Sequence, residues 1–223
     1  MGEAIGQSLA TAVGVALSPV PIIAVILMLT TPRARSNGPA FLGGWILGLA
    51  AVGTVVLLVA GPSATSGEEP ATWVGWLKLA LGALLLLVAV RQFRGRPRHG
   101  AEAAMPAWMN TIDHFGTGKS LAMGAALSGA NPKNLLLAVA GASAIAQTGI
   151  PGGEQAAAYA IFAVVGSLGV AAPLVLYFAL GKRSASMLAE LKDWMAQHNA
   201  VIMAVLCLVI GAKLIGDALT LLG

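Results

Sequence analysis

The sequence is poor in charge. Only 10% of its 223 residues are Asp, Glu, Lys or Arg, whereas 57% are hydrophobic. A soluble domain usually carries about 25% charged residues, so this scarcity excludes an ordinary soluble domain and indicates an integral membrane protein. The formal net charge of +4 does not indicate a nucleic-acid partner. The basic residues lie in short loops between apolar runs, where membrane orientation accounts for them.

Cysteine and histidine are also scarce. Cys207 is the only cysteine, which disfavours a thiol–disulfide electron carrier, a class that needs two cysteines. His99, His114 and His198 lie in loops or at the end of an apolar run, whereas metal export needs ligands clustered at membrane depth. The sequence shows no Ser, His and carboxylate residues, and no two acidic residues, placed within reach of one another as a catalytic set. We therefore expect neither an enzyme nor a metal or other cofactor.

Long apolar segments are what the sequence does contain. A hydrocarbon core of about 30 Å needs roughly 20 apolar residues per helix. The first segment begins almost at Met1 without a basic leader, which favours a retained helix over a signal peptide. We therefore predict an all-α polytopic membrane protein with six transmembrane helices, at about 4–30, 39–61, 71–91, 120–147, 155–180 and 199–222.

The loop charges predict the orientation of these helices. The second and fourth loops contain no Lys or Arg and carry Glu68, Glu69 and Glu154. Because basic loops stay in the cytoplasm, we expect a multi-pass plasma (inner) membrane protein with both termini extracytoplasmic. The basic residues of the odd-numbered loops are Arg33 and Arg35; Arg91, Arg94, Arg96, Arg98 and Lys119; and Lys182, Arg183 and Lys192.

Two cytoplasmic loops have an amphipathic pattern. The apolar residues of "MPAWMNTIDHFG" and of "SMLAELKDWMAQH" fall on one helical face, which predicts short helices lying in the inner interface. Simple anchoring is one interpretation, and gating or partner binding is the other. Asp113 and His114, at the inner mouth of the fourth span, are the gating candidates.

An internal repeat relates the two halves of the chain. "ALSPVP" in the first span matches "ALSGANPKN" in the fourth, and both place a proline-bearing break near the middle of the span. Three spans per repeat, an odd number, invert the second copy. The predicted organisation is a first three-helix repeat at 1–93, a basic cytoplasmic loop with its short helix at 94–118, and a second repeat at 119–223. Helices 1 and 4 are expected to be broken at the midplane.

The two breaks predict a substrate site. Proline removes a backbone donor and frees carbonyl groups, which in a membrane must face protein or a water-filled cavity. Secondary transporters place such breaks at the midplane and bind substrate there. With the positive ends of the half-helices, these residues predict a site for a phosphate, sulfate or carboxylate group: Ser18, Pro19, Pro21, Ser128, Asn131, Pro132, Lys133 and Asn134.

Three further ionisable residues lie within the predicted spans. Lys213 and Asp217 are four residues apart and could form an ion pair on one helix face, while Lys78 could extend to the interface. Asp217 is the only carboxylate inside a predicted span and is therefore the candidate proton carrier. The excess of cations favours an anionic substrate.

The motifs "SPVPI", "PAWMNTID" and "NPKNLLLA" resemble the glycopeptidolipid-addressing and sulfolipid-addressing proteins of actinobacteria, in the lysine exporter superfamily. The resemblance spans nearly the whole chain, although Gly129 stands where the first repeat has Pro19. It implies a six-helix plasma-membrane protein with inverted three-helix repeats that moves cell-envelope lipids or small solutes outward.

The function that we expect is export of an anionic amphiphile, such as a cell-envelope lipid or glycolipid, or of a small anionic metabolite. The partners are then membrane lipids and the anionic substrate. The alternative is a non-transporting accessory or scaffold protein of a lipid-export complex, with the amphipathic loops as its docking surface. The Gly-rich helices permit close packing within one protomer or in a homodimer.

Overall fold

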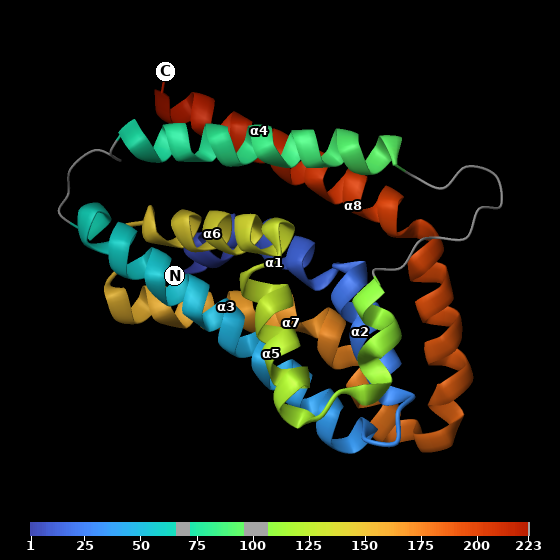
Figure 1. Ribbon diagram of the computed structural model, residues 1–223. Helices are drawn as coiled ribbons and strands as arrows, with labels where there is room; N and C mark the ends of the chain where they lie inside the picture. The colour runs from blue at the N-terminus through green and yellow to red at the C-terminus, as the bar shows by residue number, and fades with distance from the viewer. Residues whose placement is uncertain (66–71, 96–106, 223) are drawn as a thin grey trace.

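A computed structural model describes residues 1–65, 72–95 and 107–222 of the chain, and all regular structure within them is helical (Figure 1). The elements are α1 (Gly2–Ala16), α2 (Pro19–Leu29), α3 (Ala34–Thr65), α4 (Thr72–Arg94), η1 (Ala107–His114), α5 (Thr117–Gly129), α6 (Pro132–Ala146), α7 (Gly152–Leu180), η2 (Gly181–Arg183) and α8 (Ser184–Leu222).

Four helices, α3, α4, α7 and α8, are long and apolar enough to cross a membrane. The helices α1 and α2 make a fifth candidate as one span bent by 49°. The fourth predicted span is divided into α5 and the shorter apolar helix α6. By length and apolar composition, the described residues thus contain four or five candidate spans, compared with the six that the sequence predicts. Much of the basic loop, with Arg96 and Arg98, and the acidic pair Glu68 and Glu69 lie outside the described residues.

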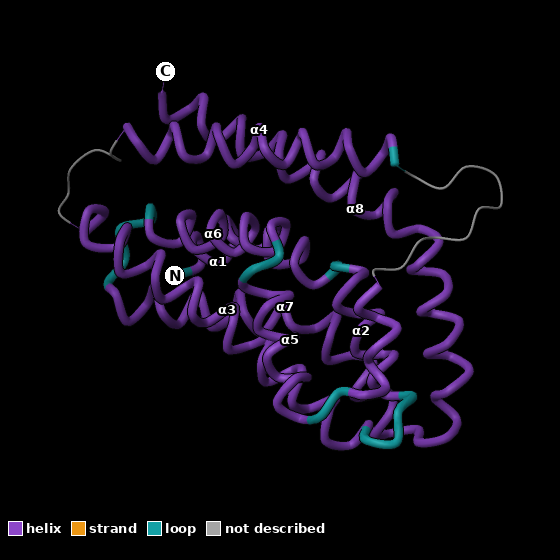
Figure 2. The backbone as a smooth tube through the Cα atoms, viewed as in Figure 1, coloured by secondary structure: helices purple, strands orange, loops and turns teal. Residues whose placement is uncertain are grey.

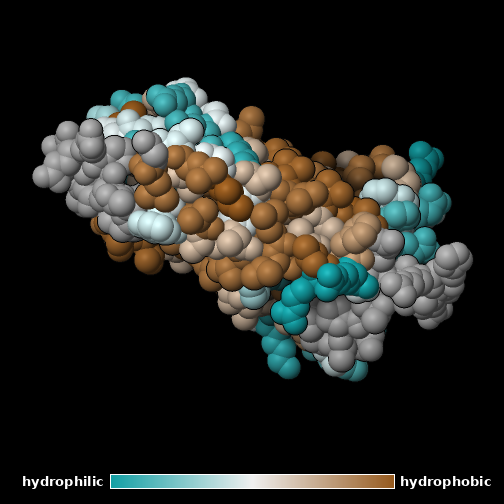
Figure 3. Space-filling view, turned by 90° about the horizontal axis from the view of Figure 1, so that it is seen from above, coloured by the Kyte–Doolittle hydropathy of each residue, from teal (hydrophilic) through white to brown (hydrophobic). Residues whose placement is uncertain are grey.

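The outer surface is apolar along the long helices. Figure 3 looks onto the side of the molecule where α4 and α8 lie, and brown apolar residues cover the middle of this face. Large apolar side chains exposed to this extent would be unfavourable in water, so the surface is that of a multi-pass membrane protein. The most exposed of them include Val55, Leu58, Val59, Val164, Val175, Leu87, Val209 and Leu219.

Both predicted helix breaks are present (Figure 2). Ser18 and Asn131 each precede a proline, and a proline disfavours the helical conformation of the residue before it. Ser18 accordingly has φ −78° and ψ 108°, and Asn131 has φ −67° and ψ 121°. In both cases the proline becomes the first residue of the new helix, a position where its missing N–H costs nothing. The two new helices therefore begin at Pro19 and Pro132.

The helices pack in pairs that reach across the two halves of the chain. α4 packs along α8, α3 along α5, and α1 against α6 and α7. Glycine permits two of these approaches. A Cβ atom at Gly44 of α3 would collide with the carbonyl oxygen of Leu121 in α5, and one at Gly169 of α7 would collide with the carbonyl oxygen of Ala16 in α1.

The two amphipathic loop segments fold differently from each other. The first forms the 3-10 helix η1, which packs against α2 and buries Met109 and Ile112. The second is continuous with the last span, because α8 runs unbroken from Ser184 to Leu222. Figure 1 shows α8 changing direction: its first part stands across the end of the bundle, and its last part lies alongside α4. On the first part Leu188 and Met195 are buried, whereas Trp194 is exposed.

Candidate functional site

The two helix breaks meet in the interior through the side chain of Lys133. This lysine, the second residue of α6, is only 4% exposed. Its ammonium Nζ donates hydrogen bonds to the carbonyl oxygen of Gly14 at 2.7 Å and to Oγ of Ser18 at 2.6 Å. A residue of the second half of the chain is thus bonded directly to the break of the first half.

The broken helix explains why the Gly14 carbonyl accepts this bond. In a continuous helix the N–H of Ser18 would donate to Gly14, but it donates to Val15 instead, at 3.2 Å. The Val15 carbonyl is open to it because the residue four positions later, Pro19, has no N–H. The break therefore frees the Gly14 carbonyl, and Lys133 satisfies it.

At the second break, Asn134 satisfies the carbonyl group that the break frees. The N–H of Asn131 donates to Ala126 rather than to Leu127, which leaves the Leu127 carbonyl without its helical donor. Nδ2 of Asn134 donates to this carbonyl at 2.8 Å, and its Oδ1 accepts a hydrogen bond from Oγ of Ser18 at 2.6 Å. Ser18 therefore joins both breaks, as the acceptor for Lys133 and the donor to Asn134.

The other predicted site residues lie at or near the breaks but outside this network. Oδ1 of Asn131 accepts a hydrogen bond from the Lys133 backbone N–H at 3.1 Å and caps α6. Ser128 is fully buried, yet its hydroxyl donates to Ala125 of its own helix. Pro19 and Pro21 are buried in the first turn of α2, whereas Pro132 is exposed. The structure therefore brings Ser18, Lys133 and Asn134 together and leaves Ser128 in the contact with α3.

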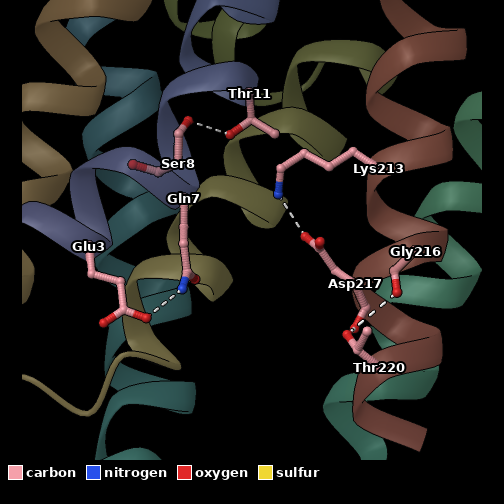
Figure 4. A network of polar contacts seen from close by, with 8 residues as sticks. All are labelled: Glu3, Gln7, Ser8, Thr11, Lys213, Gly216, Asp217 and Thr220. Atoms are coloured by element: carbon pink, nitrogen blue, oxygen red, sulfur yellow. Dashed lines mark hydrogen bonds and ion pairs between the residues drawn. The ribbon is translucent and has the colours of Figure 1, made fainter. Parts of the chain in front are cut away.

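A polar cavity brings together the remaining charged residues of the predicted spans. It has a volume of about 300 Å³ and lies between the beginning of α1, α4, the end of α6 and the end of α8. Nζ of Lys213 lies 2.7 Å from Oδ2 of Asp217, so the expected ion pair is present (Figure 4). Lys78 does not extend to solvent, because its side chain is only 7% exposed. The cavity is lined by Gln7, Lys78, Gln147, Lys213, Asp217, Thr220 and Leu221.

A larger groove of about 530 Å³ runs between α3 and α7 and is almost entirely apolar. Tyr159 of α7 lines it, and its hydroxyl donates to the carbonyl oxygen of Leu49 in α3 at 2.9 Å. That bond satisfies the Tyr159 hydroxyl, and the hydroxyl of Ser167, also in the wall, donates to the Ala163 carbonyl within α7 at 2.7 Å. The groove is lined by Leu42, Ile46, Ala50, Thr54, Leu57, Ala156, Tyr159, Ala160, Ala163, Val164, Ser167, Leu168 and Ala171.

The gating candidates lie away from these sites. Asp113 and His114 are exposed at the end of η1, just before α5 begins. The buried contact at this end of the molecule is made by their neighbour Phe115, whose carbonyl accepts a hydrogen bond from Nδ2 of Asn37 at 2.8 Å. The bond ties the segment before α5 to α3.

A comparison with protein families identifies the chain. The model of the Sap, sulfolipid-1-addressing protein family matches residues 9–220. The chain belongs to this family. The match includes both helix breaks, the Lys133 network and all the residues that line the polar cavity except Gln7 and Leu221. A search of curated proteins and a search of solved structures found no match. Family membership and the apolar helices together describe a membrane protein linked to lipid addressing.

The sequence did not indicate several groups that the structure places at these sites. The carbonyls of Gly14 and Leu127 have no side-chain signal, although the spacing from each proline-bearing break could have located them. Gln7, Gln147 and Thr220 line the cavity but are ordinary polar residues near helix ends. Their position follows from how α1, α6 and α8 pack, which the sequence pattern alone does not specify.

Proposed function

We propose that this protein is a transporter that exports an anionic amphiphile, a cell-envelope lipid or glycolipid, across the plasma membrane. The observation that carries the proposal is the hydrogen-bond network of Ser18, Lys133 and Asn134, which couples two broken helices in the protein interior. An ammonium group is costly to bury in a membrane protein and usually marks a substrate or ion pathway. A small anionic metabolite is the second possible substrate class.

The described conformation corresponds to a closed state of this site. Lys133 already has two acceptors, so an anionic headgroup must take the place of the Gly14 carbonyl and the Ser18 hydroxyl. That exchange requires α1 and α2 to move relative to α6. Because Ser18 is bonded to residues serving both breaks, a movement at one break alters the other, as alternating access at a midplane site requires.

The helix contacts support an inverted-repeat organisation, with α1 to α4 corresponding to α5 to α8. Under that correspondence contacts should occur in matched pairs, and several do, although the contact of α1 with α6 has no counterpart of similar extent between α5 and α2. α1 contacts α7 while α5 contacts α3; α2 contacts α8 while α6 contacts α4; and α2 contacts α7 while α6 contacts α3. In the proposed topology both termini are extracytoplasmic, and 1–93 and 119–223 are the two repeats.

The proposed substrate is an amphiphile because the protein offers both kinds of surface. The Lys133 network and the polar cavity supply cations for a headgroup, and the groove between α3 and α7 is long and apolar enough to hold an acyl chain. The family description links its members to a sulfolipid, which is itself an anionic amphiphile.

The test is lipid movement in vesicles that contain only the purified protein. A fluorescent phosphatidylglycerol is the anionic probe, and a phosphatidylcholine with the same label is its neutral counterpart. We expect the protein to accelerate transbilayer movement of the anionic probe. Lys133→Gln should slow it by about tenfold or more, as expected from losing a charge-assisted hydrogen bond. Lys119→Gln, at an exposed lysine, is the matched control and should leave the rate unchanged.

A wild-type protein that moves neither probe would contradict the exporter proposal and favour the accessory or scaffold function. A folded Lys133→Gln protein with the wild-type rate would remove Lys133 from the site. Asp217 is the proposed proton carrier, and the same vesicles with an imposed pH gradient test it. If the rate still responds to the gradient in Asp217→Asn, another group carries the proton.

A further inference from the structure

The polar cavity between α1, α4, α6 and α8 contains a cation that has no partner among the described residues. Lys78 is buried, with only 7% of its surface exposed. Among the residues that the structure describes, no hydrogen bond or ion pair reaches its ammonium group. Asp217 attracts it, but that carboxylate is bonded to Lys213. The charged residues that line the cavity are therefore two lysines and one aspartate, with a formal excess of one positive charge.

A second donor in the same wall also lacks an acceptor. Nε2 of Gln147, just after the end of α6, is buried and has no hydrogen-bond partner within the part of the chain that the structure describes. A buried donor without an acceptor is unfavourable, and most such groups in proteins have a partner. Nε2 of Gln147 therefore lacks an acceptor atom, and the ammonium group of Lys78 faces the same cavity with no bonded acceptor among the described residues.

The other groups at the cavity are already engaged. Nε2 of Gln7 donates to Oε1 of Glu3 at 2.9 Å, and the Thr220 hydroxyl donates to the Asp217 carbonyl at 2.9 Å. Figure 4 shows Lys213 and Asp217 pointing toward each other on α8, with Gln7 and Glu3 on α1 at the opposite side. Glu3 is exposed and is not part of the cavity lining, so its charge is accessible to solvent.

We infer that this cavity is a binding site for a singly charged oxyanion: a phosphodiester, sulfate ester or carboxylate. Such a group supplies acceptors to both Lys78 and Gln147 and neutralises the excess charge. A volume of about 300 Å³ is at the small end of ligand pockets and suits a headgroup rather than acyl chains. The anion comes either from a lipid headgroup or from a soluble ion, which the experiment below distinguishes.

The experiment measures binding by purified protein in detergent, so its outcome does not depend on transport. Phosphatidylglycerol and phosphatidylcholine with matched acyl chains are titrated and their binding is followed by native mass spectrometry. We expect phosphatidylglycerol to bind about tenfold more tightly, the effect of one charge-assisted hydrogen bond. This preference should be lost in Lys78→Gln and kept in Lys78→Arg. It should also be kept in Lys119→Gln, the matched exposed control.

A second measurement tests the soluble source. Thermal unfolding is followed with sodium methyl sulfate, a soluble monoanionic sulfate ester, and with sodium chloride at the same concentration. A rise of the unfolding temperature with methyl sulfate that Lys78→Gln abolishes identifies a soluble-anion site. Lipid preference without an effect of methyl sulfate identifies a headgroup site. Gln147→Leu, which removes the side-chain amide with the second donor and leaves Lys78 in place, should weaken binding several-fold.

Two results would overturn the assignment. One is equal binding of the two lipids together with no specific effect of methyl sulfate on the unfolding temperature. The other is an undiminished anion preference in a Lys78→Gln protein that elutes and unfolds as the wild type does. Loss of folding is not expected in that variant, because it removes a buried charge that has no partner.

Discussion

Ser18 and Ser128 occupy matching places in the two repeated segments, but we expect very different consequences when each is replaced by alanine. Both side chains are almost completely buried, at 2% and 0% exposure. Ser18 accepts a hydrogen bond from Lys133 and donates one to Asn134, across more than one hundred residues of chain. The Ser128 hydroxyl donates only to Ala125 in its own helix.

The magnitude follows from the groups that each change leaves unpaired. Ser18→Ala removes one of the two acceptors of Lys133 and the donor to Asn134 Oδ1. A hydrogen bond to a charged group contributes about 1.5–3 kcal/mol, and an interhelical one in a membrane about 0.6 kcal/mol on average. We therefore expect Ser18→Ala to lower the free energy of unfolding by about 2–4 kcal/mol. Ser128→Ala leaves no interhelical group unpaired and should cost less than about 1 kcal/mol.

The assay is reversible unfolding in mixed micelles with increasing SDS, followed by circular dichroism. The double variant Ser18→Ala/Asn134→Ala extends the test, because residues that share a hydrogen bond should show non-additive effects of about 0.5–3 kcal/mol. Equal destabilisation by Ser18→Ala and Ser128→Ala would refute the reasoning, since it would mean that the bridge between the breaks contributes nothing beyond an ordinary buried serine.

Two further predictions concern packing and topology. Gly44→Ala should destabilise the protein by about 1–3 kcal/mol, because the added Cβ meets the backbone of α5. The neighbouring Gly43 has open space around a Cβ, so Gly43→Ala should be neutral or stabilising by up to about 1 kcal/mol. The same SDS titration compares the two variants. Cys207 is fully buried and should not react with a membrane-impermeant maleimide. In intact cells Glu3→Cys should then be labelled and Arg35→Cys should not; the reverse pattern would contradict extracytoplasmic termini.

Local signals made the helix breaks predictable. Ser18-Pro19 and Asn131-Pro132 each contain a residue that proline forces out of the helical conformation, which is a property of neighbours in the chain. The pairing of Lys213 with Asp217 was predictable for the same reason, because a spacing of four residues brings the two side chains together on any helix. Both features are present in the structure.

Contacts between distant helices were not predictable in this way. By its position in the sequence Lys78 could extend to the interface, but the face of α4 that carries it turns toward α8, and Lys78 is buried. Ser18 forms hydrogen bonds between helices, whereas Ser128 bonds within its own helix. This difference likewise depends on which helix faces each break, not on the sequence match between the two segments. The continuity of α8 could have been seen: no Gly or Pro occurs between Ser184 and Gly211, so nothing separates the amphipathic segment from the span.

The two buried lysines, Lys133 and Lys78, differ in their hydrogen-bond acceptors and in the space beside them. In the proposed exporter this difference determines which of the two can bind an anion first. Lys133 has two acceptors within 2.7 Å and lines neither the polar cavity nor the apolar groove. Lys78 has a cavity beside it and no bonded acceptor in residues 1–65, 72–95 and 107–222. In the described conformation an anion can therefore occupy the Lys78 cavity without any rearrangement, whereas binding at Lys133 requires the bridge through Ser18 to open first. The conformation thus corresponds to a state in which the midplane is closed and the cavity at the beginning of α1 and the end of α8 is ready to hold a headgroup.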